Sequence, residues 1–137
     1  MTRLTLLGTG GGRFATMTQE RATGGVYLED GVSLHIDPGP GSLVMMKRAR
    51  LDPMRTDGIL VSHCHPDHYT DAEVLLEAMT NGTHTQRGFL AGSVSVLEGD
   101  GTIGPAISEY HKAAVENVHV MRAVSYTHLT LPTTPYV

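Results

Sequence analysis

The chain has 137 residues with a net charge of −4, 40% hydrophobic residues and 5% aromatic residues. This length predicts one domain with a small core, and the negative charge excludes a global basic field that would attract nucleic acid. One cysteine excludes an internal disulfide and favours a reducing compartment, while no apolar stretch reaches the ~20 residues of a membrane span. The N-terminal residues lack a signal-peptide pattern. We therefore expect a cytoplasmic protein without a membrane partner.

The first third of the sequence predicts three strands. An apolar run at 4–7 precedes the glycine-rich stretch 8–12, and the polar stretch 13–23 is expected to be a loop. Two further strands are expected at 26–28 and 32–36, because Asp30-Gly31 between apolar runs is typical of a hairpin. Asp37 ends this third strand, and Ser42 is expected to cap a helix reaching about residue 50.

The remaining pattern alternates between strands and helices. Residues 58–61 predict a buried strand, followed by a helix capped by Thr70 or Asp71, with Val74 on its apolar face. One or two strands are expected at 88–97, a loop at 99–104, a helix at 105–115 and a last strand at 118–121. This order predicts an α/β fold.

The strand at 58–61 runs into the most informative segment, His63-Cys64-His65-Pro66-Asp67-His68. Neutral imidazole and carboxylate are ligands that zinc accepts, and alternate residues of an extended segment point the same way. We therefore expect His63, His65, Asp67 and His68 to bind metal, and Cys64 to be a buried thiol. Asp37 has two interpretations: a carboxylate that orients a ligand imidazole, or a simple turn former before Pro38.

Residues 59–71 resemble the H-x-H-x-D-H signature of the metallo-β-lactamase-fold hydrolases. The opening Leu6-Leu7-Gly8-Thr9-Gly10 is similar to the branch with the tRNA 3′-end processing ribonucleases and related phosphodiesterases. His35-Ile36-Asp37-Pro38-Gly39 resembles the strand of that superfamily that ends beside the metal pocket. The resemblance implies that residues 1–122 are a truncated domain, the N-terminal half of an αββα sandwich.

The same resemblance implies a dinuclear zinc enzyme, with manganese or iron as alternative metals. His63 and His65 would bind the first ion, and Asp67 and His68 would bind the second. A metal-bound hydroxide would attack an ester-like bond, with Asp67 as a catalytic residue that orients this nucleophile or relays its proton. A small-molecule or nucleotide phosphodiester is the expected substrate, with RNA, thioesters, lactones and β-lactams left open.

Two further expectations concern the chain as a whole. Residues 123–137 carry no charge, fit no element of the preceding pattern and resemble the translation of a transposase-type sequencing adapter, so we expect a non-native tail. With ligands from a second half missing, the 137-residue chain is expected to be inactive by itself, and homodimer formation is left open. The non-enzymatic alternative is a single-metal binding or sensor module that uses the four motif residues.

Overall fold

The computed structural model describes residues 1–122, so the expected adapter-derived tail at 123–137 lies outside the described residues. Six strands form one sheet in the order β1-β2-β3-β4-β5-β6. Their bounds are β1 Arg3–Leu6, β2 Val26–Glu29, β3 Ser33–Ile36, β4 Gly58–Val61, β5 Phe89–Ser93 and β6 Asn117–Met121. Strands β1 to β3 pair antiparallel, whereas β3 to β6 are parallel. The expected strands and hairpin are therefore confirmed, and the fold is α/β.

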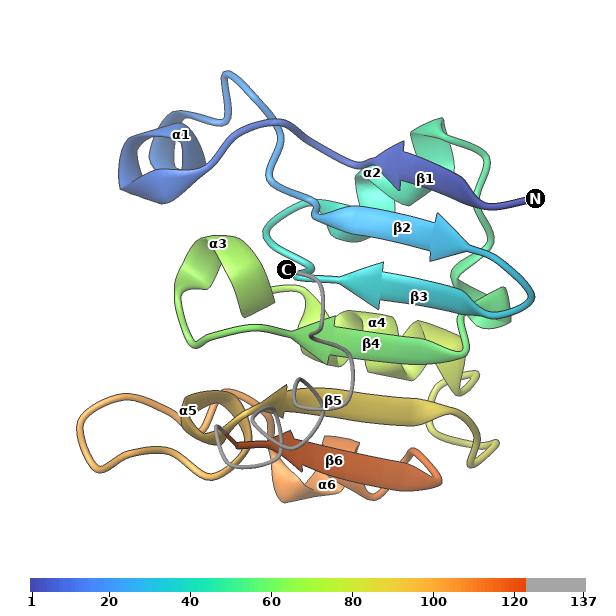
Figure 1. The fold of residues 1–137 in the computed structure, drawn as a ribbon, viewed down its shortest axis with the longest axis vertical. Helices are drawn as coiled ribbons and strands as arrows, with labels where there is room; N and C mark the ends of the chain where they lie inside the picture. The colour runs from blue at the N-terminus through green and yellow to red at the C-terminus, as the bar shows by residue number, and fades with distance from the viewer. Residues whose placement is uncertain (123–137) are drawn as a thin grey trace, which may run out of the picture.

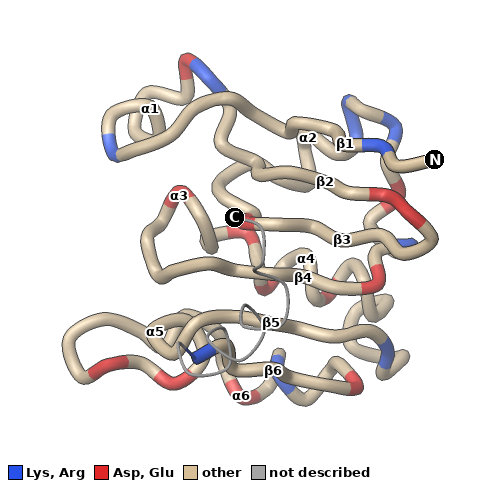
Figure 2. Tube along the Cα trace, viewed as in Figure 1, with Lys and Arg blue, Asp and Glu red and all other residues tan. Residues whose placement is uncertain are grey.

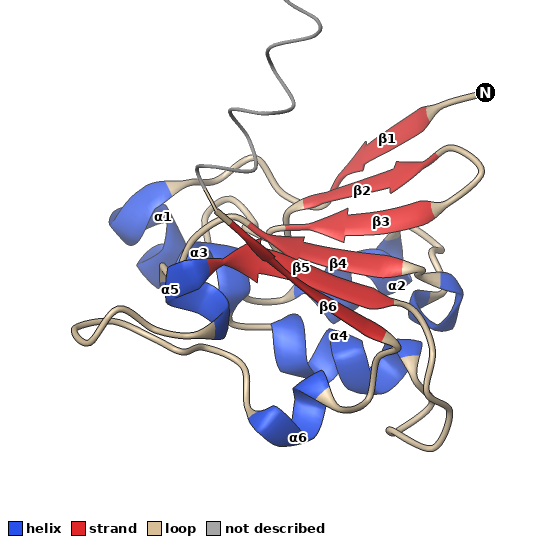
Figure 3. Cartoon of the chain, turned by 60° about the horizontal axis from the view of Figure 1, so that its bottom comes forward, coloured by secondary structure: helices blue, strands red, loops and turns tan. Residues whose placement is uncertain are grey.

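The helices are short and lie on one face of the sheet or beyond its ends (Figure 3). Their bounds are α1 Gly12–Thr18, α2 Ser42–Arg48, the 3-10 turn η1 Pro53–Arg55, α3 Pro66–Tyr69, α4 Ala72–Met79, α5 Val94–Leu97 and α6 Glu109–Lys112. The carboxyl ends of the parallel strands all point toward the end of the sheet where α1 and α3 lie (Figure 1). Ligand sites of open α/β sheets are commonly found at this end.

The core lies between the helices and the covered sheet face. Alternation along the strands places Tyr27, His35, Ile59 and Leu90 in this core, each no more than 2% exposed. Apolar residues of α2 and α4 complete it, among them Met46, Leu75, Leu76 and Met79.

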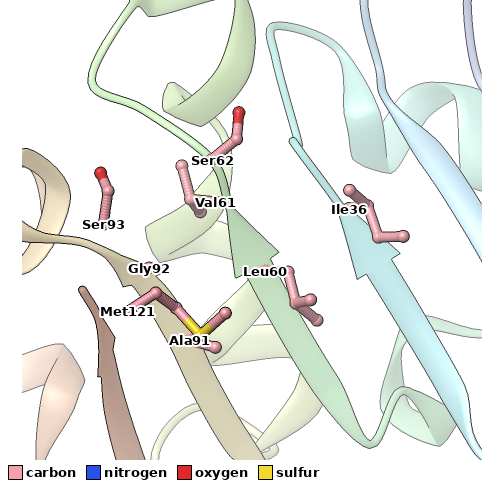
Figure 4. Close-up of a pocket in the computed structure, with 8 residues that line it drawn as sticks. All are labelled: Ile36, Leu60, Val61, Ser62, Ala91, Gly92, Ser93 and Met121. Atoms are coloured by element: carbon pink, nitrogen blue, oxygen red, sulfur yellow. The ribbon is translucent and has the colours of Figure 1, made fainter. Parts of the chain in front are cut away.

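Within residues 1–122, no helix covers the other face of the sheet, where the alternate strand positions are mostly apolar. Its polar members include Ser93, Asn117 and His119. The apolar members, here called the open face, are Leu4, Leu6, Val26, Leu28, Leu34, Ile36, Leu60, Phe89, Ala91 and Met121. Strands β3 to β6 carry no charged residue, and the charges lie mainly in the connections (Figure 2). A hollow of about 280 Å³ opens on this face, lined by residues of β3 to β6 that include Ile36, Leu60 and Met121 (Figure 4).

Four local expectations were wrong. The stretch 13–23, expected as a loop, contains α1, whose Thr16 and Thr18 hydroxyls bond to the carbonyls four residues earlier. The motif itself contains the unexpected short helix α3, which begins at Pro66. Residues 94–97 form α5 rather than strand, and the expected helix at 105–115 shrinks to α6.

Two individual side chains also differ from expectation. Ser42 does not cap α2; Gly41 occupies the cap position, and the Ser42 hydroxyl bonds to the carbonyls of Gly24 and Gly39 inside the core. Val74 is 45% exposed, because the buried stripe of α4 runs through Ala72, Leu75, Leu76 and Met79 instead.

Candidate metal centre

The motif residues occupy the connection between β4 and α4. His63 and His65 lie on the segment that leaves β4, and Pro66 begins α3, which carries Asp67 and His68. Proline is well suited to the first turn of a helix, where its missing N–H has no intrahelical partner. This change from extended chain to helix turns Asp67 and His68 back toward the two preceding imidazoles.

The three histidine rings lie against one another at the end of the sheet. The ring centroid of His63 is 4.6 Å from that of His65 and 4.1 Å from that of His68. Asp67 lies beside this group, with its Oδ2 3.2 Å from Nε2 of His68. The structure thus brings together the four residues that the sequence suggested as metal ligands.

Asp37 reaches the same place from the neighbouring strand. It follows β3, and its Oδ2 is 3.0 Å from Nδ1 of His68, 31 residues away in the sequence. Its backbone N–H also donates to the carbonyl of Leu60 in β4, which holds the end of β3 against the motif. The contact with His68 favours the orienting interpretation of Asp37 over that of a turn former alone.

The pKa shifts in the cluster follow from burial and from neighbouring charges. Burial lowers the pKa of His63, and the nearby His68 and His65 lower it further, so its neutral form is favoured. Burial by itself would raise the pKa of Asp67, but the hydrogen bond from the Gly12 amide and the charge of His68 more than offset this, and the net pKa is lowered. Neutral imidazole and ionised carboxylate are the forms that bind zinc.

Cys64 stands apart from this group. It is 5% exposed and belongs to the apolar core, and burial raises the pKa of its thiol. A thiol that resists ionisation is a poor ligand and a poor nucleophile. This location agrees with the expected buried thiol.

The donor set fits zinc in its chemistry and, for one pair, in its spacing. Two ligands of a tetrahedral zinc ion lie roughly 3.3 Å apart, given metal–ligand distances of about 2.0–2.1 Å. Asp67 Oδ2 and His68 Nε2 are 3.2 Å apart. Within residues 1–122, however, no three or more His, Cys, Asp or Glu side chains are placed so that together they could hold a metal ion.

Two residues that contact the site, Ser62 and Gly12, were not predicted from the sequence. Ser62 lies within hydrogen-bond distance of both Asp37 and His63, at 2.8 Å in each case. Gly12 donates its N–H to Asp67. The position of Ser62 between a buried strand and the first histidine was the available signal, and the run of three glycines was the signal for Gly12.

A hollow of about 760 Å³ adjoins the cluster. The motif side is formed by His65 to His68, and the opposite side by α1. Arg13, Phe14 and Met17 line the α1 side, where Phe14 and Met17 are 75% and 71% exposed. The candidate metal centre therefore opens onto a space with an apolar wall and one positive charge.

Comparisons with known proteins identify the family. Residues 33–135 match the family described as Beta-lactamase superfamily domain. The chain belongs to the metallo-β-lactamase superfamily. This match covers the motif, Asp37 and most of the sheet.

Relatives of this superfamily domain include an uncharacterized protein and, at a greater distance, a ribonuclease Z. The chain is 47% identical over 116 residues to an uncharacterized protein of Methanocaldococcus jannaschii, covering 84% of this chain and 44% of that protein. It is 35% identical over 80 residues to ribonuclease Z of Thermococcus kodakarensis, covering 58% of this chain and 24% of the enzyme. The chain therefore spans less than half the length of the curated relatives it matches.

Two solved structures share the fold. The metallo-β-lactamase-fold protein YhfI of Bacillus subtilis has a TM-score of 0.64 at 21% identity, covering 88% of this chain and 46% of that one. The short form of human tRNase Z has a TM-score of 0.63 at 22% identity, covering 90% and 46%. The six-stranded sheet thus matches about half of a metallo-β-lactamase-fold chain. No helix within residues 1–122 is long and apolar enough to cross a membrane.

Proposed function

We propose that this chain carries part of the active centre of a metal-dependent hydrolase that cleaves phosphodiesters. The observation that carries the proposal is the meeting of His63, His65, Asp67 and His68 at the end of β4, in a chain of the metallo-β-lactamase superfamily. His63 and His65 would hold one zinc ion, and Asp67 and His68 a second. When bound, zinc acidifies a coordinated water and polarises the ester group.

The protein residues have separable tasks in this proposal. Asp37 holds His68 through Nδ1, which leaves Nε2 for the metal. Asp67 accepts a hydrogen bond at Oδ2 from the Gly12 N–H, and its lowered pKa favours the ionised form that binds metal, while Oδ1 could orient the attacking water. Residues of α1 line the hollow on the side opposite this group.

The substrate class rests on the relatives and on the adjoining hollow. The similarity to ribonuclease Z supports a nucleic-acid phosphodiester, which Arg13 could contact through a phosphate oxygen. Phe14 offers an exposed ring against which a base could stack.

The test uses a longer protein in which residues 1–122 are followed by a second half like that of the relatives. We expect it to bind two zinc ions and to hydrolyse bis(p-nitrophenyl) phosphate, with His65→Ala losing at least about 100-fold in kcat/KM. His84→Ala, an exposed histidine outside the cluster, is the matched control. A zinc-loaded protein that cleaves thioesters, lactones or β-lactams but no phosphodiester would contradict the substrate class.

The second candidate is a single-metal binding or sensor module without catalysis, which would use His63, His65, Asp67 and His68 alone. A longer protein that binds one metal ion tightly and hydrolyses none of these esters would support this alternative.

A further inference from the structure

We propose that Ser62 is a positioning residue that holds the imidazole of His63 with its proton on Nδ1 and its Nε2 lone pair free. The inference rests on the proposed role of His63 as a metal ligand, but its test requires neither catalysis nor bound metal. Ser62 is the last residue before the motif and follows β4 directly (Figure 4).

The backbone and the side chain of Ser62 both bind the same carboxylate. Its N–H donates to Oδ1 of Asp37 at 2.7 Å, and its hydroxyl donates to Oδ2 of Asp37 at 2.8 Å. This two-point contact fixes the orientation of the carboxylate and of the hydroxyl together. Asp37 has a left-handed backbone with φ of 54°, a conformation that Asp tolerates better than most residues.

Counting protons then assigns the tautomer of His63. A hydroxyl has one proton to donate, and Ser62 gives it to Asp37, since an ionised carboxylate can only accept. The oxygen of Ser62 is also 2.8 Å from Nδ1 of His63. That contact is a hydrogen bond only if Nδ1 carries the proton and donates it to the Ser62 oxygen.

One carboxylate, that of Asp37, therefore determines which nitrogen carries the proton in two imidazoles. Oδ2 of Asp37 accepts from Nδ1 of His68 directly, and through the Ser62 hydroxyl it controls Nδ1 of His63. Both rings therefore turn their Nε2 atoms away from Asp37, and their centroids are 4.1 Å apart. A hydrogen bond on one imidazole nitrogen determines which nitrogen can bind metal.

The exposure of Ser62 makes the inference testable by substitution. Because the side chain is exposed, Ser62→Ala removes the hydroxyl without leaving a cavity in the core. Ser62→Thr keeps the hydroxyl and serves as the conservative rescue. Ser95→Ala is the matched control, because Ser95 lies in α5 and its hydroxyl contacts that of Ser93 at 3.1 Å, away from the motif.

The decisive experiment reads the tautomer of His63 by NMR in the ¹⁵N-labelled, metal-free 137-residue chain. The spectra are recorded well above about pH 6.5, the ordinary imidazole pKa, so that the ring is neutral. We expect the proton on Nδ1 in the parent chain, in Ser62→Thr and in Ser95→Ala. In Ser62→Ala we expect it to move to Nε2, the tautomer that neutral imidazole side chains prefer in water.

A second readout is zinc affinity, measured by competition with a chromophoric chelator. Ser62→Ala should weaken zinc binding by about 10–100-fold, with recovery in Ser62→Thr and no change in Ser95→Ala. An Nε2–H tautomer in the parent chain, or an unchanged tautomer in Ser62→Ala, would overturn the inference. A tautomer change in a chain that binds no zinc would support the role of Ser62 and contradict the proposed function.

Discussion

The backbone N–H of Gly12 donates a 3.0 Å hydrogen bond to Oδ2 of Asp67, across 55 residues of sequence. The bond joins the first residue of α1 to α3, and it helps to lower the pKa of Asp67. The position of α1 and the orientation of one candidate ligand are therefore coupled.

Gly12 and its neighbour Gly11 allow this coupling to be tested with matched substitutions. A Cβ at either position would meet no atom within 4 Å, but Gly12 has φ of 82° whereas Gly11 is extended. Gly12→Ala should therefore cost about 1–2 kcal/mol in backbone strain, and Gly11→Ala close to nothing. We expect faster amide exchange in α1 and weaker zinc binding only in Gly12→Ala. Equal behaviour of the two variants would show that the contact with Asp67 does not depend on this backbone conformation.

The stability of the fold should depend on pH through His35. This residue is fully buried, its Nε2 donates to the carbonyl of Gly24, and burial lowers its pKa. The folded state keeps His35 neutral while the unfolded chain takes up a proton near about pH 6.5. The contribution of neutral His35 to the free energy of unfolding is therefore complete above about pH 6.5. It is lost as the pH falls toward the folded-state pKa, and the free energy of unfolding then decreases by at most about 1.4 kcal/mol per pH unit.

Urea unfolding of the metal-free chain between about pH 5 and pH 8 measures this slope. His35→Gln, which lacks the titrating group, should have a smaller slope than the parent chain. His84→Gln changes an exposed histidine and should keep the parent slope. If the free energy of unfolding of His35→Gln depends on pH as steeply as that of the parent chain, a group other than His35 is responsible for the pH dependence.

The open face should make the 137-residue chain self-associate. It carries ten apolar residues and no charge, and Leu4 and Met121 on it are 63% and 56% exposed. Contiguous apolar patches above roughly 400 Å² promote association. The double substitution Leu4→Lys and Met121→Lys should raise the monomer fraction in sedimentation velocity without lowering the unfolding midpoint.

A control for this prediction lies on the opposite side of the molecule. Val44 in α2 is equally exposed, at 56%, but belongs to the helical layer. Val44→Lys should leave the monomer fraction unchanged. A parent chain that is monomeric at all concentrations would contradict the prediction.

The strands and the cluster could be predicted from the sequence, because both depend on local patterns. The apolar run at 58–61 became β4 with the expected bounds, and Asp30-Gly31 between two apolar runs predicted the hairpin correctly. The motif is a run of six residues, so its side chains lie close together in any fold that lets the chain turn at Pro66.

The remaining features depend on contacts between distant segments. Ser42 was expected to cap a helix because the cap preference is local, yet its hydroxyl finds acceptors at Gly24 and Gly39 in the folded chain. Helix α1 buries none of its residues, so it produces no apolar stripe by which it could be recognised. The role of Ser62 appears only when Asp37 is brought beside it by the pairing of β3 with β4.

The most direct test of the metal centre is a zinc titration of the 137-residue chain against a competing chelator, with His65→Ala and His84→Ala in parallel. We expect measurable zinc binding by the parent chain, at least about 10-fold weaker binding by His65→Ala, and parental affinity in His84→Ala. No zinc binding by the parent chain, or equal affinity in His65→Ala, would contradict a metal centre at this end of the sheet.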